Sequence, residues 1–390
     1  MTNNNLNNMA TGYLKKKLLE IILKILDHKE KIFIYTIIGL FVFIFFYVII
    51  FTSYPVKKSL AYNVFDKWIS MINLKPYNSC RNQSKKYSED GMLVDKNTRL
   101  CNYYVASSYK SYLIGGSNGW VCPDAIRKII HSGARLIDID IFNYPKWGKD
   151  AEPIVANGQD FGQRIYSRNW ESFEEVARVI RNCAFNSGQI INYNEPLFIN
   201  LRLNVEGNFY TLDKLAYIIK DMFDGRLLPR KYSYQRKSIA AASMDELKGK
   251  IVIFADKYFE HSKLNELVNY TPLKNFMRIT PRLKFNDSND LNEHATFNKR
   301  WLGMVLNDDD NINHDFYGAQ YFGCQFYLIN YAINDYFMEE YIKRFKNESF
   351  IFKPYQRRYH PTSVKLPEKQ DPRLSFRPIT LENNFFKATI

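Results

Sequence analysis

The sequence predicts an α/β fold, because stretches typical of strands alternate with stretches typical of helices. Short apolar runs of strand length lie at residues 136–142, 153–156, 197–203 and 250–255. Patterns with helical spacing accompany them at 123–131, 172–184, 212–223 and 243–247. Strand and helix in turn build parallel βα units, which predicts a doubly wound sheet or a (βα)8 barrel. The last third adds strands at 323–331 and 349–353 around a helix at 332–345.

The charge balance favours a membrane over nucleic acid as a partner. The 390 residues carry a net charge of +14, which suits an anionic membrane surface or nucleic acid. The basic residues are spread along the chain and no nucleic-acid motif stands out, so we expect a lipid bilayer and no nucleic acid among the partners. Five cysteines without a C-x-x-C pair argue against a zinc site or a dense disulfide framework.

Residues 1–31 are predicted to be a cytoplasmic, basic amphipathic segment. Apolar residues at helical spacing alternate there with lysines, which suits a helix lying on an anionic headgroup layer. An ordinary extension of the helix that follows is a compatible alternative.

Residues 32–56 are predicted to be a transmembrane anchor. The run 32–51 has twenty residues without a charge, and as a helix it would span about 30 Å, the thickness of a bilayer core. It is too long, and too poor in small residues, for a cleaved signal peptide. Six lysines precede the run and three follow it, which favours a cytoplasmic N-terminus and leaves the side of the large domain open. The sequence thus predicts a single-pass membrane protein.

Two acidic residues stand on one face of the strand predicted at 136–142. The period of two directs Ile137, Ile139 and Ile141 to a packed layer and Asp138 and Asp140 to the opposite side. Two carboxylates at i and i+2 repel each other unless a cation lies between them. The pair therefore indicates a metal site, a basic partner or a catalytic dyad, with two solvated acids at a strand end as the plain alternative.

Seven segments then follow one another in the order of a known family's motifs. They are N-Y-Y-V-A-S-S-Y-K-S-Y-L at 102–113, G-A-R-L-I-D-I-D at 133–140, P-I-V-A-N-G at 153–158, the stretch 176–204, S-M-D-E-L-K-G-K-I-V-I at 243–253, and the stretches 322–331 and 341–354. In this order they resemble the catalytic barrel of eukaryotic-type phosphoinositide-specific phospholipase C. The resemblance covers the barrel and divides it into an X-like half at 99–256 and a Y-like half at 257–356. The polar residues 57–98 are expected to be a connector, with a short helix at 60–72 as an open alternative, and the proline-containing residues 357–390 are expected to be an extended tail.

The resemblance implies a distorted TIM-like (βα)8 barrel of the phospholipase C type, whose C-terminal mouth binds an inositol lipid headgroup. In the family, one histidine is the base that acts on the 2-hydroxyl, and a second histidine stabilises the transition state. A calcium ion held by Asn, Glu, Asp and Glu neutralises the developing charge.

This chain departs from that family at both histidine positions. The first carries Tyr109 and the second carries Asn157. A tyrosine with a pKa near 10 is a poor general base at pH 7, and an amide exchanges no proton. The matched positions therefore lack the family's acid–base chemistry.

The matched calcium positions carry Lys110, Asp138, Asp140 and Arg202, and only the two aspartates are competent ligands. We predict that the two cations pair with the two aspartates in an internal cluster that takes the metal's place. The alternative is that these residues lie at the barrel rim and never meet. Arg278, in R-I-T-P, resembles the family's R-I-Y-P and is a candidate for headgroup binding.

These departures predict a membrane-anchored phospholipase C-like barrel that is catalytically inactive and acts as a binding or structural module. No cofactor is expected, and the partner is a phosphoinositide headgroup or a protein. One alternative is an active, calcium-dependent phosphatidylinositol phosphodiesterase, a phosphoric diester hydrolase, with a relocated base. Its candidates are His131, His261, His294, His314 and His360. A second alternative is a structural protein of an envelope or organelle membrane.

Overall fold

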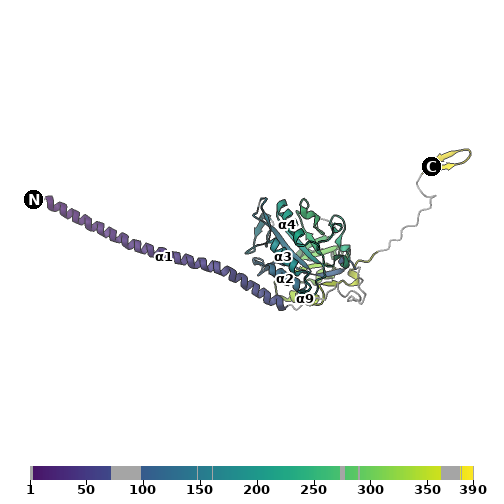
Figure 1. The fold of residues 1–390 in the computed structure, drawn as a ribbon, viewed down its shortest axis with the longest axis horizontal. Coiled ribbons are helices and arrows are strands. Elements are labelled where there is room, and N and C mark those ends of the chain that lie inside the picture. The colour runs from purple at the N-terminus through teal and green to yellow at the C-terminus, as the bar shows by residue number, and fades with distance from the viewer. Residues whose placement is uncertain are drawn as a thin grey trace.

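The computed structural model describes residues 3–71, 98–146, 148–159, 161–272, 277–288, 290–361, 378 and 380–389. Its first element is one long helix, α1 (Asn3–Met71), which extends away from a compact domain (Figure 1). Within the described residues, no helix is both long enough and apolar enough to cross a membrane. This finding does not support the transmembrane anchor expected at 32–56.

The last turns of α1 belong to the domain. Phe65 and Ile69, one helical turn apart, are 3% and 4% exposed and pack against helix α2 (Pro123–His131). The first part of the predicted connector at 57–98 is thus the end of α1, which an apolar i, i+4 pair docks on the domain, and helix is present over most of 60–72, where a short helix was an open alternative. Residues 72–97 lie outside the described part of the chain.

Within the described residues, seven parallel strands form the sheet that organises the domain, in the order β10-β9-β4-β1-β13-β12-β11. They are β1 (Tyr103–Ser108), β4 (Leu136–Tyr144), β9 (Leu197–Asn204), β10 (Ile251–Ala255), β11 (Met277–Pro281), β12 (Leu302–Leu306) and β13 (Phe326–Ile329). All seven contribute to one apolar cluster. In it, the ring of Phe254 on β10 lies 5.6 Å from that of Phe326 on β13, four places along the sheet. Such a contact requires the sheet to curl into a barrel rather than lie open.

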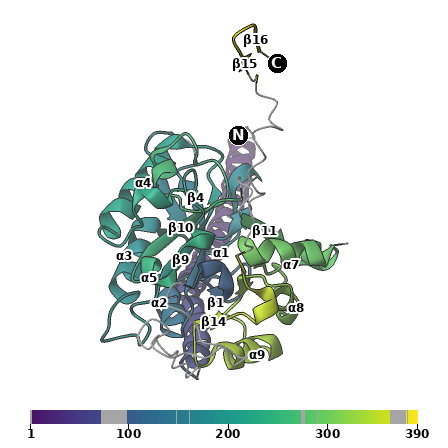
Figure 2. The same ribbon diagram turned by 90° about the vertical axis from the view of Figure 1, so that its right-hand side faces the viewer.

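Helices cover the outside of this barrel. The first half supplies α2, α3 (Phe173–Cys183), α4 (Phe209–Met222) and α5 (Met244–Leu247). The second half supplies α6 (Arg282–Asn286), α7 (Leu291–Arg300), α8 (Tyr317–Tyr321) and α9 (Tyr336–Phe345). Figure 2 shows α2–α5 on one side of the strands and α7–α9 on the other. Ile137, Ile139 and Ile141 pack into the outer layer as predicted.

Side-chain caps begin several of these helices where the sequence has a short polar residue. In each case a hydroxyl, amide or carboxylate oxygen accepts a hydrogen bond from the first turn. The capping residues are Ser172, Asn208, Ser243, Asp290 and Asp335.

The remaining strands are short and flank the barrel. The strand β5 (Glu152–Val155) is antiparallel to the end of β4 and also pairs with β8 (Glu171–Ser172), so the stretch 153–156 is not the parallel barrel strand that was expected. β14 (Phe350–Phe352) is antiparallel to β1. Three hairpins join β2 (Leu113–Ile114) to β3 (Trp120–Val121), β6 (Gly158–Gln159) to β7 (Arg164–Ile165), and β15 (Thr380–Glu382) to β16 (Lys387–Thr389). The last lies in the tail expected to be extended.

Candidate functional site at the barrel mouth

The mouth is the end of the barrel at which the parallel strands reach their carboxyl termini. Asp138 and Asp140 on β4 share a face with Leu136, which packs inside the barrel. On the neighbouring strand β9, Arg202 stands opposite Asp140 and Asn200 stands opposite Asp138. The parallel register of β4 and β9 thus places the Arg202 guanidinium beside the carboxylates of Asp138 and Asp140.

The Arg202 guanidinium contacts both carboxylates. Its Nε lies 2.6 Å from Oδ1 of Asp140, and its Nη2 lies 3.0 Å from Oδ2 of Asp138 and 3.1 Å from Oδ2 of Asp140. The two acids are 0% and 4% exposed and the arginine is 18% exposed. The planar fork of arginine suits such bidentate contacts, so the predicted pairing of Arg202 is present.

The other donors around the two aspartates come from the chain itself. The Asn200 side-chain amide donates to Oδ1 of Asp138 at 2.7 Å, and the backbone N–H of Lys110 donates to Oδ2 of Asp138 at 3.1 Å. The Tyr112 hydroxyl donates to Oδ2 of Asp140 at 2.7 Å. Every carboxylate oxygen of the pair therefore has a partner. A calcium ion needs several such oxygens free to coordinate it and repels a guanidinium, so these residues do not fit calcium.

Burial and charge act in opposite directions in this cluster. Burial raises the pKa of Asp138, Arg202 opposes this rise, and the neighbouring Asp140 adds to it. Burial alone would lower the pKa of Arg202, but Asp138 and Asp140 outweigh it and raise that pKa well above its usual range. The arginine stays charged and also lies 5.0 Å from the centre of the Tyr109 ring, a favourable cation–π distance.

Lys110 binds a different acid from the one predicted. Its ammonium, 4% exposed, lies 2.5 Å from Oδ1 of Asp309, on the loop after β12. The backbone of Lys110 adopts φ +40°, a left-handed conformation that side chains rarely take. In this turn the N–H reaches Asp138 while the side chain reaches Asp309. The expected ion pairs between Lys110 and the strand aspartates are thus wrong, because the turn after β1 directs its ammonium across the mouth.

Tyr109 occupies the first family histidine position and acts as a donor here. Its hydroxyl donates to Oδ1 of Asp309 at 2.9 Å. Burial raises the pKa of this hydroxyl far above the usual value; Arg202 opposes the rise, and Asp309 adds to it. The phenol therefore stays protonated at neutral pH and cannot act as a general base.

Asn157 occupies the second family histidine position and joins two loops. It is 1% exposed, its amide donates to the carbonyl of Ser117 at 2.5 Å, and its backbone N–H donates to the Ser167 hydroxyl at 3.1 Å. Its Oδ1 is buried and has no hydrogen-bond partner among the described residues. It is a structural link between the β2–β3 hairpin and the segment after β7.

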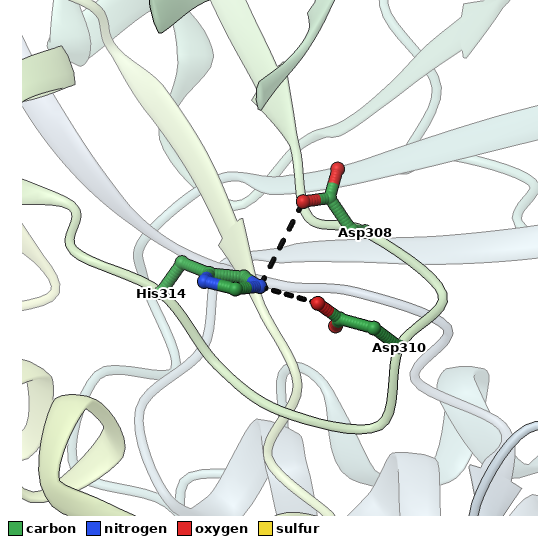
Figure 3. Close-up of side chains that lie close together, drawn as sticks. All are labelled: Asp308, Asp310 and His314. Carbon is green, nitrogen blue, oxygen red and sulfur yellow. Dashed lines mark hydrogen bonds and ion pairs between the residues drawn. The ribbon is translucent and has the colours of Figure 1, made fainter. Parts of the chain in front are cut away.

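A second acidic group lies on the loop after β12, and sequence reasoning missed it. Asp308 lies 2.5 Å from the Arg282 guanidinium, and Asp310 lies 2.7 Å from Nε2 of His314. The same nitrogen is 3.7 Å from Asp308, as Figure 3 shows. These three side chains, two carboxylates and one imidazole, stand close enough together to hold a cation. However, the Asp308 carboxylate already pairs with the Arg282 guanidinium. The one signal in the sequence is the run of acids that follows a strand end.

Arg278 does not reach the mouth. It lies near the amino end of β11, opposite Gly303, and its guanidinium binds Glu293 at 2.7 Å and stacks 4.0 Å from the centre of the Phe297 ring. These partners belong to α7 on the outside of the barrel. This position does not support a role of Arg278 in headgroup binding. Arg282, four residues further along the chain at the start of α6, is instead the arginine that contacts the loop after β12, called the mouth loop below.

Comparison with known proteins places these features in a family. Residues 96–257 match the model of the phosphatidylinositol-specific phospholipase C X domain. A human 1-phosphatidylinositol 4,5-bisphosphate phosphodiesterase, eta-1, is 27% identical over 171 residues, 43% of this chain and 9% of the relative. The beta enzyme egl-8 of Caenorhabditis elegans is 24% identical over 205 residues, 52% of this chain and 13% of the relative. The chain thus matches only a small part of these relatives' length.

A solved structure shares the fold over a wider stretch. The crystal structure of PLC21 from S. officinalis superposes with a TM-score of 0.57 at 18% identity, covering 68% of this chain and 38% of that one. This coverage exceeds the X-domain match, so the likeness of fold continues into the second half of the barrel. The separate Y-like half at 257–356 stays a prediction. From the X-domain match and these relatives, we conclude that residues 96–257 form a domain of the phosphatidylinositol-specific phospholipase C X type, in a barrel that shares the fold of PLC21.

Proposed function

We propose that this protein is a membrane-associated barrel that binds an inositol lipid headgroup at its mouth without hydrolysing it. The observation that carries this proposal is the Arg202 guanidinium, 2.6–3.1 Å from oxygens of both Asp138 and Asp140. It occupies the position at which the resemblance puts a catalytic calcium ion. A fixed guanidinium supplies charge but no open coordination position for a reacting oxygen.

The absence of a base at the matched positions supports the same proposal. The Tyr109 hydroxyl is held protonated by burial, and the Asn157 amide is bound to backbone and cannot exchange a proton. General acid–base catalysis contributes about 10²–10⁴-fold to a rate. With both groups and the metal replaced, we expect no turnover above background.

The ligand class comes from the relatives, which are named for phosphatidylinositol 4,5-bisphosphate. At the mouth of this chain the donors suited to a phosphate are the Lys110 ammonium and the Tyr109 hydroxyl. Both bind Asp309, whose side chain is 60% exposed. An exposed carboxylate is a partner that a phosphate can displace, because water compensates the carboxylate once it leaves.

Membrane association is proposed from α1. Between residues 33 and 49, fifteen large apolar side chains are exposed. They occur on successive residues and so cover the helix all round rather than as one stripe. Exposed lysines lie before and after this run, at Lys15, Lys16, Lys17, Lys31 and Lys57. Such a helix is stable where lipid covers the apolar run and anionic headgroups meet the lysines.

One observation favours a second candidate, an active phosphodiesterase. His314 lies on the mouth loop beside Asp309 and is held by Asp310 at 2.7 Å. A histidine oriented by a carboxylate is a usual general base. Of the relocated bases considered above, it is the one that the structure places on this loop.

Two assays on the full chain in vesicles separate these proposals. Vesicles that contain phosphatidylinositol 4,5-bisphosphate are incubated with calcium or with a chelator, and inositol phosphate release and bound protein are measured together. We expect binding in both conditions and release in neither. Calcium-dependent release that is lost in His314→Ala and in Asp138→Asn would establish the enzyme instead.

A stability assay tests the replaced metal independently of activity. We expect the thermal midpoint of the protein to be the same with calcium and with a chelator. Arg202→Glu restores the carboxylate that the family has at this position, and we expect its thermal midpoint to rise with calcium. Arg202→Gln is the matched control without a charge. A calcium-dependent midpoint in the unmodified chain would contradict the proposal.

A further inference from the structure

The docked end of α1 runs side by side with α2 and in the same direction. The Tyr62 hydroxyl donates to Asp124, and one turn later Asp66 pairs with Lys128. A step of four residues along α1 therefore matches a step of four along α2. Phe65 and Ile69 are buried in the same apolar cluster as Ala125 and Ile129 of α2. Because successive contacts advance in the same direction along both chains, the two helices are parallel.

The direction of α2 fixes which end of the barrel α1 comes from. In a parallel βα unit the helix starts at the carboxyl end of one strand and returns to the amino end of the next. α2 follows the β2–β3 hairpin after β1 and leads into β4, so it descends from the mouth. α1 descends with it, and the part of α1 before the dock therefore lies beyond the mouth.

A further contact shows at which level along the barrel axis α1 meets the domain. The Lys58 ammonium lies 3.4 Å from the Glu171 carboxylate. Glu171 pairs with Val155, and Val155 pairs with Ile141 in the carboxyl half of β4. Lys58 thus stands at the level of the mouth. Tyr62 and Asp66 follow it along the first half of α2, and the Trp68 indole N–H donates to the carbonyl of Tyr331 in the segment after β13.

The distance from this level to the apolar run is short. Ile49 precedes Lys58 by nine residues, which is about 14 Å in a helix and no more than about 32 Å if the chain were fully extended. Pro55 lies within α1 and lacks the backbone N–H that a helix uses, which makes it the position in this stretch at which a helix axis bends most readily. A bend there changes the angle of the domain but not the end by which it is tethered.

We propose that α1 tethers the domain by its mouth end, so that the mouth faces the lipid surface that takes residues 33–49. The occupant is a bilayer because fifteen large apolar side chains point in all directions around the helix, which no single protein groove covers. The inference rests on the membrane association proposed above and is independent of headgroup binding. It assigns the barrel an orientation: the mouth is close to lipid, and the amino ends of the strands are distant.

The test compares two dye positions on the full chain with Cys80 replaced by Ser, since the other four cysteines are buried. Asn118→Cys puts a dye on the exposed β2–β3 turn at the mouth. Ser187→Cys puts one on the exposed segment between α3 and β9, at the opposite end. Both proteins are reconstituted in phosphatidylcholine–phosphatidylserine vesicles that carry a headgroup-labelled quencher lipid.

We expect the dye at position 118 to be quenched at least about twofold more than the dye at 187, because a layer of strands and helices separates the two ends. A flexible glycine–serine linker inserted between Pro55 and Val56 should reduce this contrast, whereas Pro55→Ala should preserve it. Equal quenching in protein that floats with vesicles overturns the orientation alone. Protein that does not float overturns the membrane association and the orientation with it, whatever the headgroup assays give.

Discussion

The barrel mouth contains two groups of carboxylates, and the chain neutralises them differently. Asp138 and Asp140 are nearly inaccessible, share one arginine and have a partner for every oxygen. Asp308, Asp309 and Asp310 are 18%, 60% and 42% exposed, and the nearest basic side chain is a different one for each. These side chains are Arg282, Lys110 and His314. Every carboxylate oxygen of the buried pair has a partner of its own, whereas each acid of the exposed loop has one nearest basic side chain for the whole carboxylate.

The difference follows from the cost of removing a carboxylate from water. An unpaired buried charge costs several kcal/mol, so each oxygen of the strand pair needs its own donor. An exposed acid keeps part of its hydration, and its ion pairs contribute about 0–1 kcal/mol. We therefore expect the strand pair to be fixed and the loop to exchange partners. Four substitutions test this contrast.

The largest effect is expected for Arg202→Ala. It leaves two buried carboxylates side by side without their cation and should lower the free energy of unfolding by about 3–5 kcal/mol. Urea unfolding at neutral pH measures this loss. Combining it with Asp138→Asn and Asp140→Asn should recover part of the loss, because the neutral amides need no counter-charge. A loss below about 1 kcal/mol would show that the pair is hydrated in solution.

The next effect concerns Asp256, beside β9 at the mouth. Burial raises the pKa of Asp256 to about 6, above the value of about 3.9 in an unfolded chain. The folded state binds the proton more tightly, so the free energy of unfolding falls as pH rises from about 4 to 6, by at most about 3 kcal/mol. Asp256→Asn keeps an oxygen for the Leu203 N–H, 2.9 Å away, and should remove this fall. Urea unfolding across that range measures it, and an unchanged pH profile would contradict the assignment.

Asp309→Asn should have a smaller effect. It weakens the bond to a Lys110 ammonium that is only 4% exposed, which predicts a loss of about 1–2 kcal/mol. Burial alone would raise the pKa of Asp309, but Lys110 and the Tyr109 hydroxyl outweigh it and lower that pKa. The contribution of Asp309 is therefore present at neutral pH and is lost as pH falls through the lowered pKa. The difference between variant and parent should vanish in strong acid, and a difference that persists there would point to packing instead.

Asp310→Asn should have the smallest effect. The hydrogen bond to His314 is exposed and local in sequence, so we expect a loss below about 1 kcal/mol. Glu340→Gln, which weakens an exposed ion pair with Lys343 on α9, is the matched control. A loss well above that of the control would mean that the loop is as rigid as the strand pair and would remove the contrast.

The sequence predicted the parts of this mouth that lie on regular strands. Asp138, Asp140 and Arg202 could be placed because β4 and β9 follow one another as neighbouring parallel strands, and their pairing was expected before the register was known. Asp309 could not be placed. It lies 199 residues from Lys110, and a run of three acids after a strand is indistinguishable from a solvated loop.

The fold was predictable to a similar extent and for similar reasons. The strands β4, β9 and β10 and the helices α2, α3 and α9 were expected within a few residues of their bounds. The strands β1, β11 and β12 were not. β1 is buried along its whole length, so it lacks the alternation that marks a half-exposed strand. The docking of α1 was not predicted, because the apolar residues that dock, Phe65 and Ile69 with Ala61, Tyr62 and Trp68 beside them, are spread through a polar stretch.

The Arg202 guanidinium also changes how the mouth responds to its surroundings. A bound metal ion exchanges with solution, so its occupancy, and any stability it contributes, rises and falls with its free concentration. Arg202 is covalently part of β9, and the two aspartates raise its pKa well above its usual range. Its occupancy is therefore complete at every calcium concentration and at every pH a cell reaches. We therefore expect the strand pair, unlike the exposed loop beside it, to respond neither to the calcium concentration nor to the pH range of a cell.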